Sequence, residues 1–290
     1  MQNTKPTGYA PANDNHKLAY YIEGEGFPVF IFNGFTCVQA NLKYAIEYLK
    51  NDFQVISWDY RGHGESMDKA GMHSSKANLD QFMADANSVF DHLQLKKAHI
   101  FGYSMGAQFS MQFAHDYPEK VSKIACLNGI YGKVFDQFLG TDLLGKILPG
   151  LPREIPWLNE AYKTLWKATH SIPFEIKFRI ATIALLDRGL AKTEDVKPFL
   201  QSMSTLDGEF MLALAQEIHQ HETYSFLSEI KNPSLIIASG SDLFATPAIS
   251  EKVHRLLPDS ELIIISKGTH NSNLEKPEQI FPEVLRFFKA

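Results

Sequence analysis

The chain has few cysteines and no long apolar run. Cys37 and Cys126 are its only cysteines among 290 residues. One disulfide would add little to a core of this size, so we expect reduced thiols and a cytoplasmic protein. No stretch reaches the ~18 apolar residues of a membrane-spanning helix, and the first residues lack the apolar stretch of a secretory signal. We therefore expect no membrane span.

Positive charge is also scarce. Lys and Arg number 28 against 33 Asp and Glu, which gives a net charge of −5 without basic runs. Proteins that bind nucleic acids or anionic membranes need clustered Lys and Arg, so neither is an expected partner. With 44% hydrophobic and 21% charged residues, the chain has a globular rather than a disordered composition.

Short apolar runs rich in β-branched and aromatic residues alternate with helix-like segments. A strand pair near Tyr9 and residues 18–22 is followed by runs at 28–34, 53–59, 98–104, 121–129, 233–240 and 261–266. These runs are apolar nearly throughout, as strands buried on both faces require. Crossover helices are expected at 38–50, 78–93, 105–117, 248–257 and 278–288. The alternation predicts a doubly wound, mostly parallel α/β sheet flanked by helices.

The alternation stops between residues 131 and 228. Helical periodicity is found in 159–169, 174–188 and 209–219, and a Pro- and Gly-rich stretch at 148–156 interrupts it. Such a segment can cover a sheet edge, or it can form a cap over the carboxyl ends of the strands, where open α/β sheets bind ligands. Because the chain leaves after one core strand and returns to the next, we predict a core from 1–130 and 229–290 and a helical cap from 131–228.

The strongest local signal is the pentapeptide that contains Gly102, Ser104 and Gly106. It forms a G-x-S-x-G pattern between an apolar run and a helical stretch. In a sharp strand-to-helix turn the serine is exposed at strained backbone angles, and the glycines avoid collisions with the neighbouring strand and helix. The alternative is a serine that only caps the helix. The strand–turn–helix context favours a nucleophile.

Several segments, in the right order, resemble the α/β-hydrolase superfamily, and in particular its cap-bearing serine hydrolases. Residues 59–66 (DYRGHGES) resemble the D-x-R-G-x-G-x-S segment, 239–242 with Pro247 resemble the acid loop, and 268–278 resemble the histidine loop. The resemblance covers nearly the whole chain and implies this fold with an inserted helical cap.

A catalytic triad of Ser104, Asp242 and His270 is predicted. A serine hydroxyl needs an imidazole to take its proton, and the imidazole needs a carboxylate on its other nitrogen. All three residues follow expected strands, in the order Ser, Asp, His that this fold uses. As alternatives, His63 could supply the base and Asp136 the acid.

No metal and no cofactor are expected. His219 and His221 form an H-x-H pair in a helical segment. Residues two apart on a helix point to different faces, which disfavours a metal site.

An oxyanion hole is predicted from two backbone N–H groups. One belongs to Met105, directly after the nucleophile, and the resemblance implies Phe35 for the other. Asn33 stands where the family usually has histidine. Because the donor is a main-chain group, this change need not abolish the hole, although it can alter how the loop is held.

The segment 131–228 is rich in aromatic and long aliphatic residues, among them Trp166, Phe199 and Phe210. Most of these residues pack in a core, but they are numerous enough to favour an apolar pocket as well. The sequence has no cluster of Lys and Arg that would indicate an anionic substrate. The expected substrate is a small uncharged ester with an apolar acyl group. C–C hydrolysis of vinylogous diketones is an alternative, because enzymes with a similar triad and cap catalyse it. A non-catalytic ligand receptor of this fold is a further alternative. Dehalogenase and epoxide hydrolase activity are disfavoured, because their nucleophile is an aspartate where this chain has Ser104.

Overall fold

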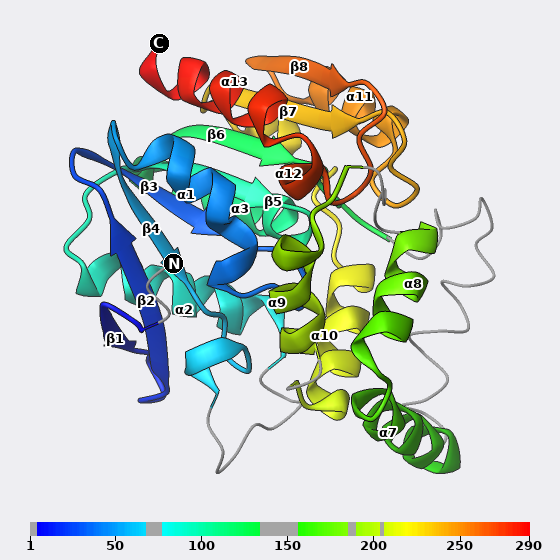
Figure 1. Ribbon diagram of the computed structural model, residues 1–290. Coiled ribbons are helices and arrows are strands. Elements are labelled where there is room, and N and C mark those ends of the chain that lie inside the picture. Colours follow the sequence, from blue (N-terminus) through cyan, green and yellow to red (C-terminus); the bar gives the residue numbers. More distant parts are fainter. Residues whose placement is uncertain (1–4, 68–76, 134–155, 185–189, 204–205) are drawn as a thin grey trace.

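A computed structural model describes residues 5–67, 77–133, 156–184, 190–203 and 206–290 (Figure 1). Its centre is an eight-stranded sheet in the order β1-β2-β4-β3-β5-β6-β7-β8. The strands are β1 (Gly8–Pro11), β2 (Lys17–Glu23), β3 (Phe27–Phe32), β4 (Phe53–Trp58), β5 (Ala98–Tyr103), β6 (Val121–Leu127), β7 (Ser234–Ser239) and β8 (Ser260–Ile265). The pairs β1–β2 and β2–β4 are antiparallel, and the remaining pairs, from β4 to β8 in the sheet order, are parallel. The predicted doubly wound sheet is confirmed.

Helices cover both faces of the sheet (Figure 1). Successive side chains of β3 point to opposite faces and enter two different apolar clusters. Phe30 and Phe32 belong to one cluster, and Val29 and Ile31 belong to the second, so both faces need a cover of helices. The cluster around Phe30 includes residues of α2 (Leu79–His92), α3 (Met105–Asp116) and α11 (Pro247–Leu256). The other includes residues of α1 (Lys43–Leu49) and α13 (Pro277–Lys289).

Two local predictions were wrong. Residues 38–50 do not form one helix, because a 3₁₀ turn, η1 (Gln39–Leu42), precedes α1. The Asn41 side chain accepts the Val38 N–H at 3.0 Å and so stabilises this turn. β8 is not buried on both faces, since it is an edge strand and Ile264 is 46% exposed. An apolar run alone does not reveal whether its strand lies at the edge.

Four helices of the predicted insertion lie together beyond the carboxyl ends of the central strands (Figure 1). They are α7 (Pro156–His170), α8 (Phe174–Ala184), α9 (Thr193–Met203) and α10 (Gly208–Gln220). The periodicity at 159–169 and 209–219 matches α7 and α10, and 174–188 matches α8 up to the undescribed residues 185–189. The sequence pattern does not predict α9, which contains Pro198.

The two ends of this helical segment meet beside the sheet. Gly132 forms an isolated bridge with Glu222, and the Thr223 N–H donates to the Tyr131 carbonyl at 2.9 Å. The chain thus leaves and rejoins the core at one place. Among the described residues, no helix combines the length and the apolar character that a membrane crossing requires.

Candidate active site

Ser104 lies on the sharp turn between β5 and α3. Its backbone angles, φ 56° and ψ −118°, fall in a region that is unfavourable for residues other than glycine. A Cβ at Gly106 would overlap the carbonyl of Phe32 on the neighbouring strand, which explains the second glycine of the pattern. The Ser104 side chain makes no helix-capping hydrogen bond. The interpretation of Ser104 as a mere helix cap was therefore wrong.

The structure brings Ser104, His270 and Asp242 together. The Ser104 Oγ lies 2.8 Å from His270 Nε2, and His270 Nδ1 lies 2.7 Å from Asp242 Oδ2. Because the carboxylate only accepts, Nδ1 carries the proton and Nε2 is free to accept the serine hydroxyl proton. This is the hydrogen-bond arrangement of a Ser-His-Asp triad.

Asp242 is held in place by the backbone that follows it. Its Oδ1 accepts the N–H groups of Phe244 at 2.8 Å and Ala245 at 3.0 Å, and its side chain is fully buried. With Oδ1 occupied in this way, Oδ2 is directed at His270. The carboxylate is therefore buried with both oxygens hydrogen-bonded, as a buried charge requires.

The two predicted oxyanion donors belong to residues that line the same pocket as Ser104. Met105 is the first residue of α3, where backbone N–H groups have no partner within the helix. Phe35 belongs to the loop after β3, and the next residue, Thr36, has φ 62°, which is unusual for a β-branched residue. Because this backbone conformation is unfavourable for threonine, other contacts must stabilise the loop in this shape.

Asn33 supplies part of that restraint. Its Oδ1 accepts the Gly34 N–H at 2.9 Å, and its Nδ2 donates to the Val38 carbonyl at 3.0 Å. The Tyr60 hydroxyl donates to the Asn33 carbonyl at 2.9 Å. The side chain that replaces the family's usual histidine thus ties together the two ends of the loop that contains Phe35.

The alternative site residues lie elsewhere or outside the described residues. His63 is fully buried, packs beside Tyr60 and Phe210, and directs Nδ1 at the Arg61 carbonyl at 3.2 Å. Asp136 lies outside the described residues.

The H-x-H pair at the end of α10 is divided by the helix terminus. His219 is on the last turn, whereas His221 is the C-cap residue. Burial lowers the pKa of His221. His219 is therefore helical, whereas the backbone of His221 is extended.

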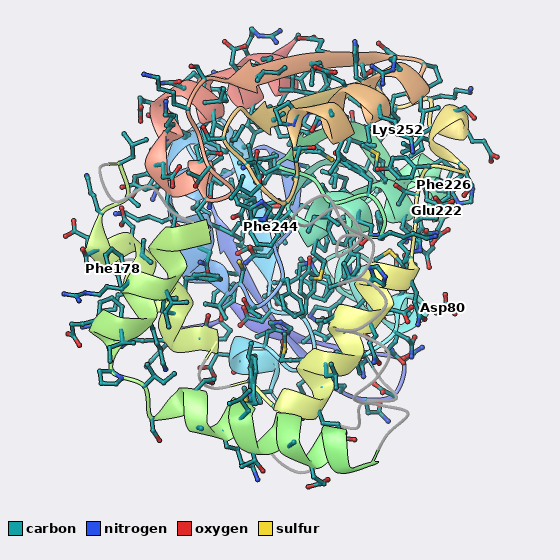
Figure 2. All side chains as sticks on the ribbon, turned by 90° about the vertical axis from the view of Figure 1, so that its right-hand side faces the viewer. Asp80, Phe178, Glu222, Phe226, Phe244 and Lys252 are labelled. Atoms are coloured by element: carbon teal, nitrogen blue, oxygen red, sulfur yellow. The ribbon has the colours of Figure 1, made fainter. Side chains whose placement is uncertain are left out.

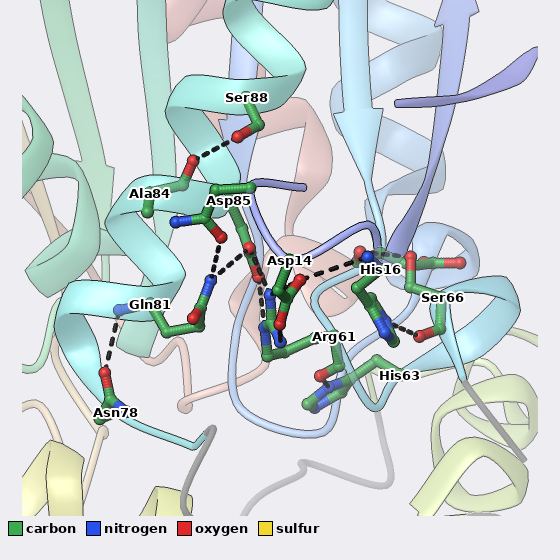
Figure 3. Close-up of polar contacts among 12 residues, drawn as sticks. Asp14, His16, Arg61, His63, Ser66, Asn78, Gln81, Ala84, Asp85 and Ser88 are labelled. Atoms are coloured by element: carbon green, nitrogen blue, oxygen red, sulfur yellow. Dashed lines mark hydrogen bonds and ion pairs between the residues drawn. The ribbon is translucent and has the colours of Figure 1, made fainter. Parts of the chain in front are cut away.

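The loop at residues 59–66 is anchored by charged groups (Figure 3). The buried Arg61 guanidinium bonds both carboxylate oxygens of Asp85 and also contacts Asp14 at 3.2 Å. Burial raises the pKa of Asp59 to about 6, although its Oδ2 accepts from Tyr21. We interpret these residues as structural supports of the loop.

His63 gives a prediction for stability against pH. Burial lowers its pKa from 6.5 to about 4. The unfolded chain therefore binds a proton more readily, so this group's contribution to stability is present above pH 6.5 and is lost as the pH falls towards 4. His63→Asn keeps a donor for the Arg61 carbonyl and removes this titration. Between pH 7.5 and pH 5 the variant should lose about 1–2 kcal/mol less unfolding free energy than the wild type.

Urea unfolding at the two pH values measures this difference. His92→Asn is the matched control, because His92 is exposed on the last turn of α2. The rising protonation of Asp59 acts in the opposite direction, but it is common to all three proteins. If the unfolding free energies of His63→Asn and the wild type changed equally with pH, the pKa of His63 would not be lowered by folding.

A cavity of about 260 Å³ opens directly at Ser104. Its described lining residues are Gly34, Phe35, Thr36, Cys37, Tyr103, Ser104, Met105, Ile130, Phe199, Ala215, Ile218, Phe244, His270 and Asn271. Phe199 comes from α9, and Ala215 and Ile218 come from α10. Figure 2, which views the molecule from the side of helices α7–α10, shows Phe244 near the middle of the view. The described lining contains no aspartate, glutamate, lysine or arginine.

Of these lining residues, Phe199 is among those that the sequence pattern indicates, whereas Ala215, Ile218 and Phe244 are not. The spacing of Ala215 and Ile218, three residues apart on a helix, was an available signal of a shared face. Phe244 lies two residues after the predicted acid. Neither spacing identifies a residue of the cavity until the positions of the core and of the helices are known.

Both cysteines are free and buried. Cys37 lines the cavity, and burial raises the pKa of its thiol to about 12. A thiol with such a pKa is not a nucleophile near neutral pH. Cys37 therefore contributes apolar surface to the cavity.

The chain belongs to the alpha/beta hydrolase fold family, whose model matches residues 26–277. It is 26% identical over 275 residues to a putative 2-succinyl-6-hydroxy-2,4-cyclohexadiene-1-carboxylate synthase of Bacillus subtilis (strain 168), with 90% of this chain and 89% of the relative covered. It is 28% identical to a 2-hydroxy-6-oxononadienedioate/2-hydroxy-6-oxononatrienedioate hydrolase of Paraburkholderia phymatum, with 81% and 76% covered.

Solved structures have the same fold. A thermophilic esterase from Thermogutta terrifontis superposes with a TM-score of 0.74 at 20% identity, and 97% of each chain is covered. Membership of the family and the similarity to the Paraburkholderia phymatum hydrolase support hydrolytic chemistry, whereas the Bacillus subtilis relative is named a synthase.

Proposed function

We propose that this protein is a serine hydrolase that cleaves small uncharged carboxylic esters with an apolar acyl group. The observation that carries the proposal is the hydrogen-bonded series Ser104–His270–Asp242, opening onto a cavity without a charged acid or base in its described lining. The series supplies an activated nucleophile, and the cavity accepts an apolar group.

The reaction follows from the atoms in place. Ser104 Oγ attacks the ester carbonyl while His270 Nε2 takes its proton, and the Phe35 and Met105 N–H groups donate to the oxyanion. His270 then passes the proton to the leaving alcohol, and an acyl-enzyme remains on Ser104. Water, deprotonated by His270, cleaves the acyl-enzyme and restores the serine. Asp242 holds Nδ1–H throughout and stabilises the imidazolium.

The helical segment has a part in this proposal. Phe199 on α9 and Ala215 and Ile218 on α10 form the side of the cavity that faces the core loops. We therefore propose that residues 131–228 act as a lid over Ser104, with the ends of the insertion joined near Gly132 and Glu222.

The described lining of the cavity favours an uncharged ester over a dianionic substrate such as the one for which the Paraburkholderia phymatum relative is named. That relative is named for a dioate, which carries two carboxylates. A buried carboxylate needs a cation or several donors, and the described lining of this cavity supplies no lysine or arginine. C–C hydrolysis of an uncharged substrate and ligand reception without turnover are the alternatives that the experiment below separates.

The size of the cavity predicts an acyl-length optimum. A volume of 260 Å³ holds about nine non-hydrogen atoms if each takes the ~30 Å³ that water occupies in the liquid. Each methylene placed in the cavity contributes ~0.8 kcal/mol, nearly fourfold in kcat/KM. We expect kcat/KM for p-nitrophenyl esters to rise to a medium acyl chain and then to fall, and bulky triglycerides to be poor substrates.

Ala215→Leu should move this optimum to an acyl chain about three carbons shorter, because leucine adds three carbons inside the cavity. Gln220→Leu is the control, since Gln220 is exposed at the end of the same helix. The assay uses monomeric esters below their aggregation limit. A profile that is flat, or that falls steadily from acetate, would remove the acyl pocket from the proposal. Binding of apolar ligands without any ester hydrolysis would favour the receptor or C–C hydrolase alternatives.

A further inference from the structure

The segment after β6 contacts the nucleophile turn through the backbone. The Ser104 N–H donates to the Leu127 carbonyl at 3.0 Å, and the Ile130 N–H donates to the Ser104 carbonyl at 3.2 Å. Both main-chain polar groups of Ser104 are therefore held by residues 127–130. Asn128, one of the two residues between these contacts, has φ 47°, a conformation that asparagine tolerates better than most residues.

The side chain of Asn128 is directed at the histidine loop. Its Nδ2 lies 2.8 Å from the His270 carbonyl, 3.1 Å from the Thr269 carbonyl and 2.9 Å from Ser272 Oγ. Ser272 Oγ also accepts from Ser239 Oγ at 2.7 Å. The two carbonyls can only accept, so the amide is present as a donor, and Asn128 is fully buried.

One residue thus connects the two loops whose separation decides whether Ser104 and His270 can exchange a proton. The Tyr103 hydroxyl adds a second contact, because it donates to the same His270 carbonyl at 3.1 Å. A base must lie within about 2.6–3.2 Å of the group it deprotonates, and a displacement of 1 Å can lower the rate about a hundredfold.

We propose that Asn128 is a positioning residue, which sets the distance between Ser104 Oγ and His270 Nε2 by donating to the backbone of the histidine loop. This inference rests on the proposed serine hydrolase function. It assigns to the end of β6 a part in the reaction, although Asn128 is not among the described residues that line the cavity.

Two variants separate the effect of the donor from that of the backbone. Asn128→Ala removes the side chain. Asn128→Asp keeps its shape and its tolerance of positive φ, but replaces the donor by an acceptor that faces two carbonyls. Each should lower kcat about ten- to a hundredfold with less than a twofold change in KM, and should slow the labelling of Ser104 by a fluorophosphonate to the same degree.

The matched control is Asn232→Ala. Asn232 Nδ2 also donates to a backbone carbonyl, that of Val121 at 2.8 Å, but from a half-buried position and at the amino end of β6, the opposite end from Asn128. This variant should lower the melting temperature without changing kcat or the labelling rate. Equal losses of kcat in Asn232→Ala and Asn128→Ala would mean that Asn128 acts only through general stability.

A nuclear magnetic resonance measurement gives a readout that does not need turnover. The Nδ1 proton of His270, bonded to Asp242, should give a downfield signal that is absent in His270→Gln. We expect this signal to broaden or disappear in Asn128→Ala and to persist in Asn232→Ala. Wild-type labelling rate and an unchanged signal in Asn128→Ala would overturn the inference. A wild-type protein that neither hydrolyses esters nor reacts with the probe would instead overturn the proposed function, and the proton signal would then decide the role of Asn128 alone.

Discussion

Ser104→Ala is expected to lower kcat for a medium-chain p-nitrophenyl ester about a million-fold, while the protein remains folded. The alanine lacks the attacking oxygen, so only substrate binding and the oxyanion donors contribute to any residual rate. The fold should persist because the Ser104 Oγ makes no helix-capping bond, and its partner is His270 rather than the scaffold. Steady-state kinetics and far-ultraviolet circular dichroism measure both quantities.

Ser88→Ala is the matched control for this change. The Ser88 hydroxyl donates to the Ala84 carbonyl at 2.8 Å on α2 (Figure 3), and neither residue is among the described residues that line the cavity. This variant should keep the wild-type kcat. Ester hydrolysis by Ser104→Ala within tenfold of the wild type would show that another group attacks the carbonyl.

Asp242→Asn is expected to lower kcat about ten-thousandfold. In the wild type, Oδ1 accepts the Phe244 and Ala245 N–H groups, and an amide oxygen can keep both bonds. The amide nitrogen is then directed at His270 Nδ1 and donates to it. The ring proton moves to Nε2, which can no longer accept the proton of Ser104. The effect therefore comes from the tautomer of His270 and leaves the geometry in place.

Asp136→Asn separates the two candidate acids of the sequence. If Asp242 is the acid, Asp136→Asn should hydrolyse esters at close to the wild-type rate. Near wild-type activity of Asp242→Asn, together with a large loss in Asp136→Asn, would assign the acid to the segment that follows β6.

The core of the fold could be predicted because parallel strands leave a local pattern. Strands such as β5 and β7 are buried at every residue, so their sequences are apolar nearly throughout. The residues that follow these strands lie at the same end of the sheet. The same logic placed Ser104, Asp242 and His270 near each other before any geometry was known.

Other features depend on the assembled fold. Pro198 argues locally against a helix, yet Val196, Phe199 and Leu200 are buried, and their packing supports α9 in spite of it. The partial exposure of β8 follows from its place at the edge of the sheet rather than from its composition. The role inferred for Asn128 depends on contacts between residues more than 140 positions apart in the chain.

The central claim is that Ser104 is the nucleophile, and covalent labelling tests it most directly. The wild-type protein is incubated with a fluorophosphonate, digested, and analysed by mass spectrometry. The triad geometry predicts one adduct per chain, on the peptide that contains Ser104, with loss of ester hydrolysis in proportion to labelling. An adduct on another residue, or full ester hydrolysis by protein in which Ser104 is labelled, would contradict the claim.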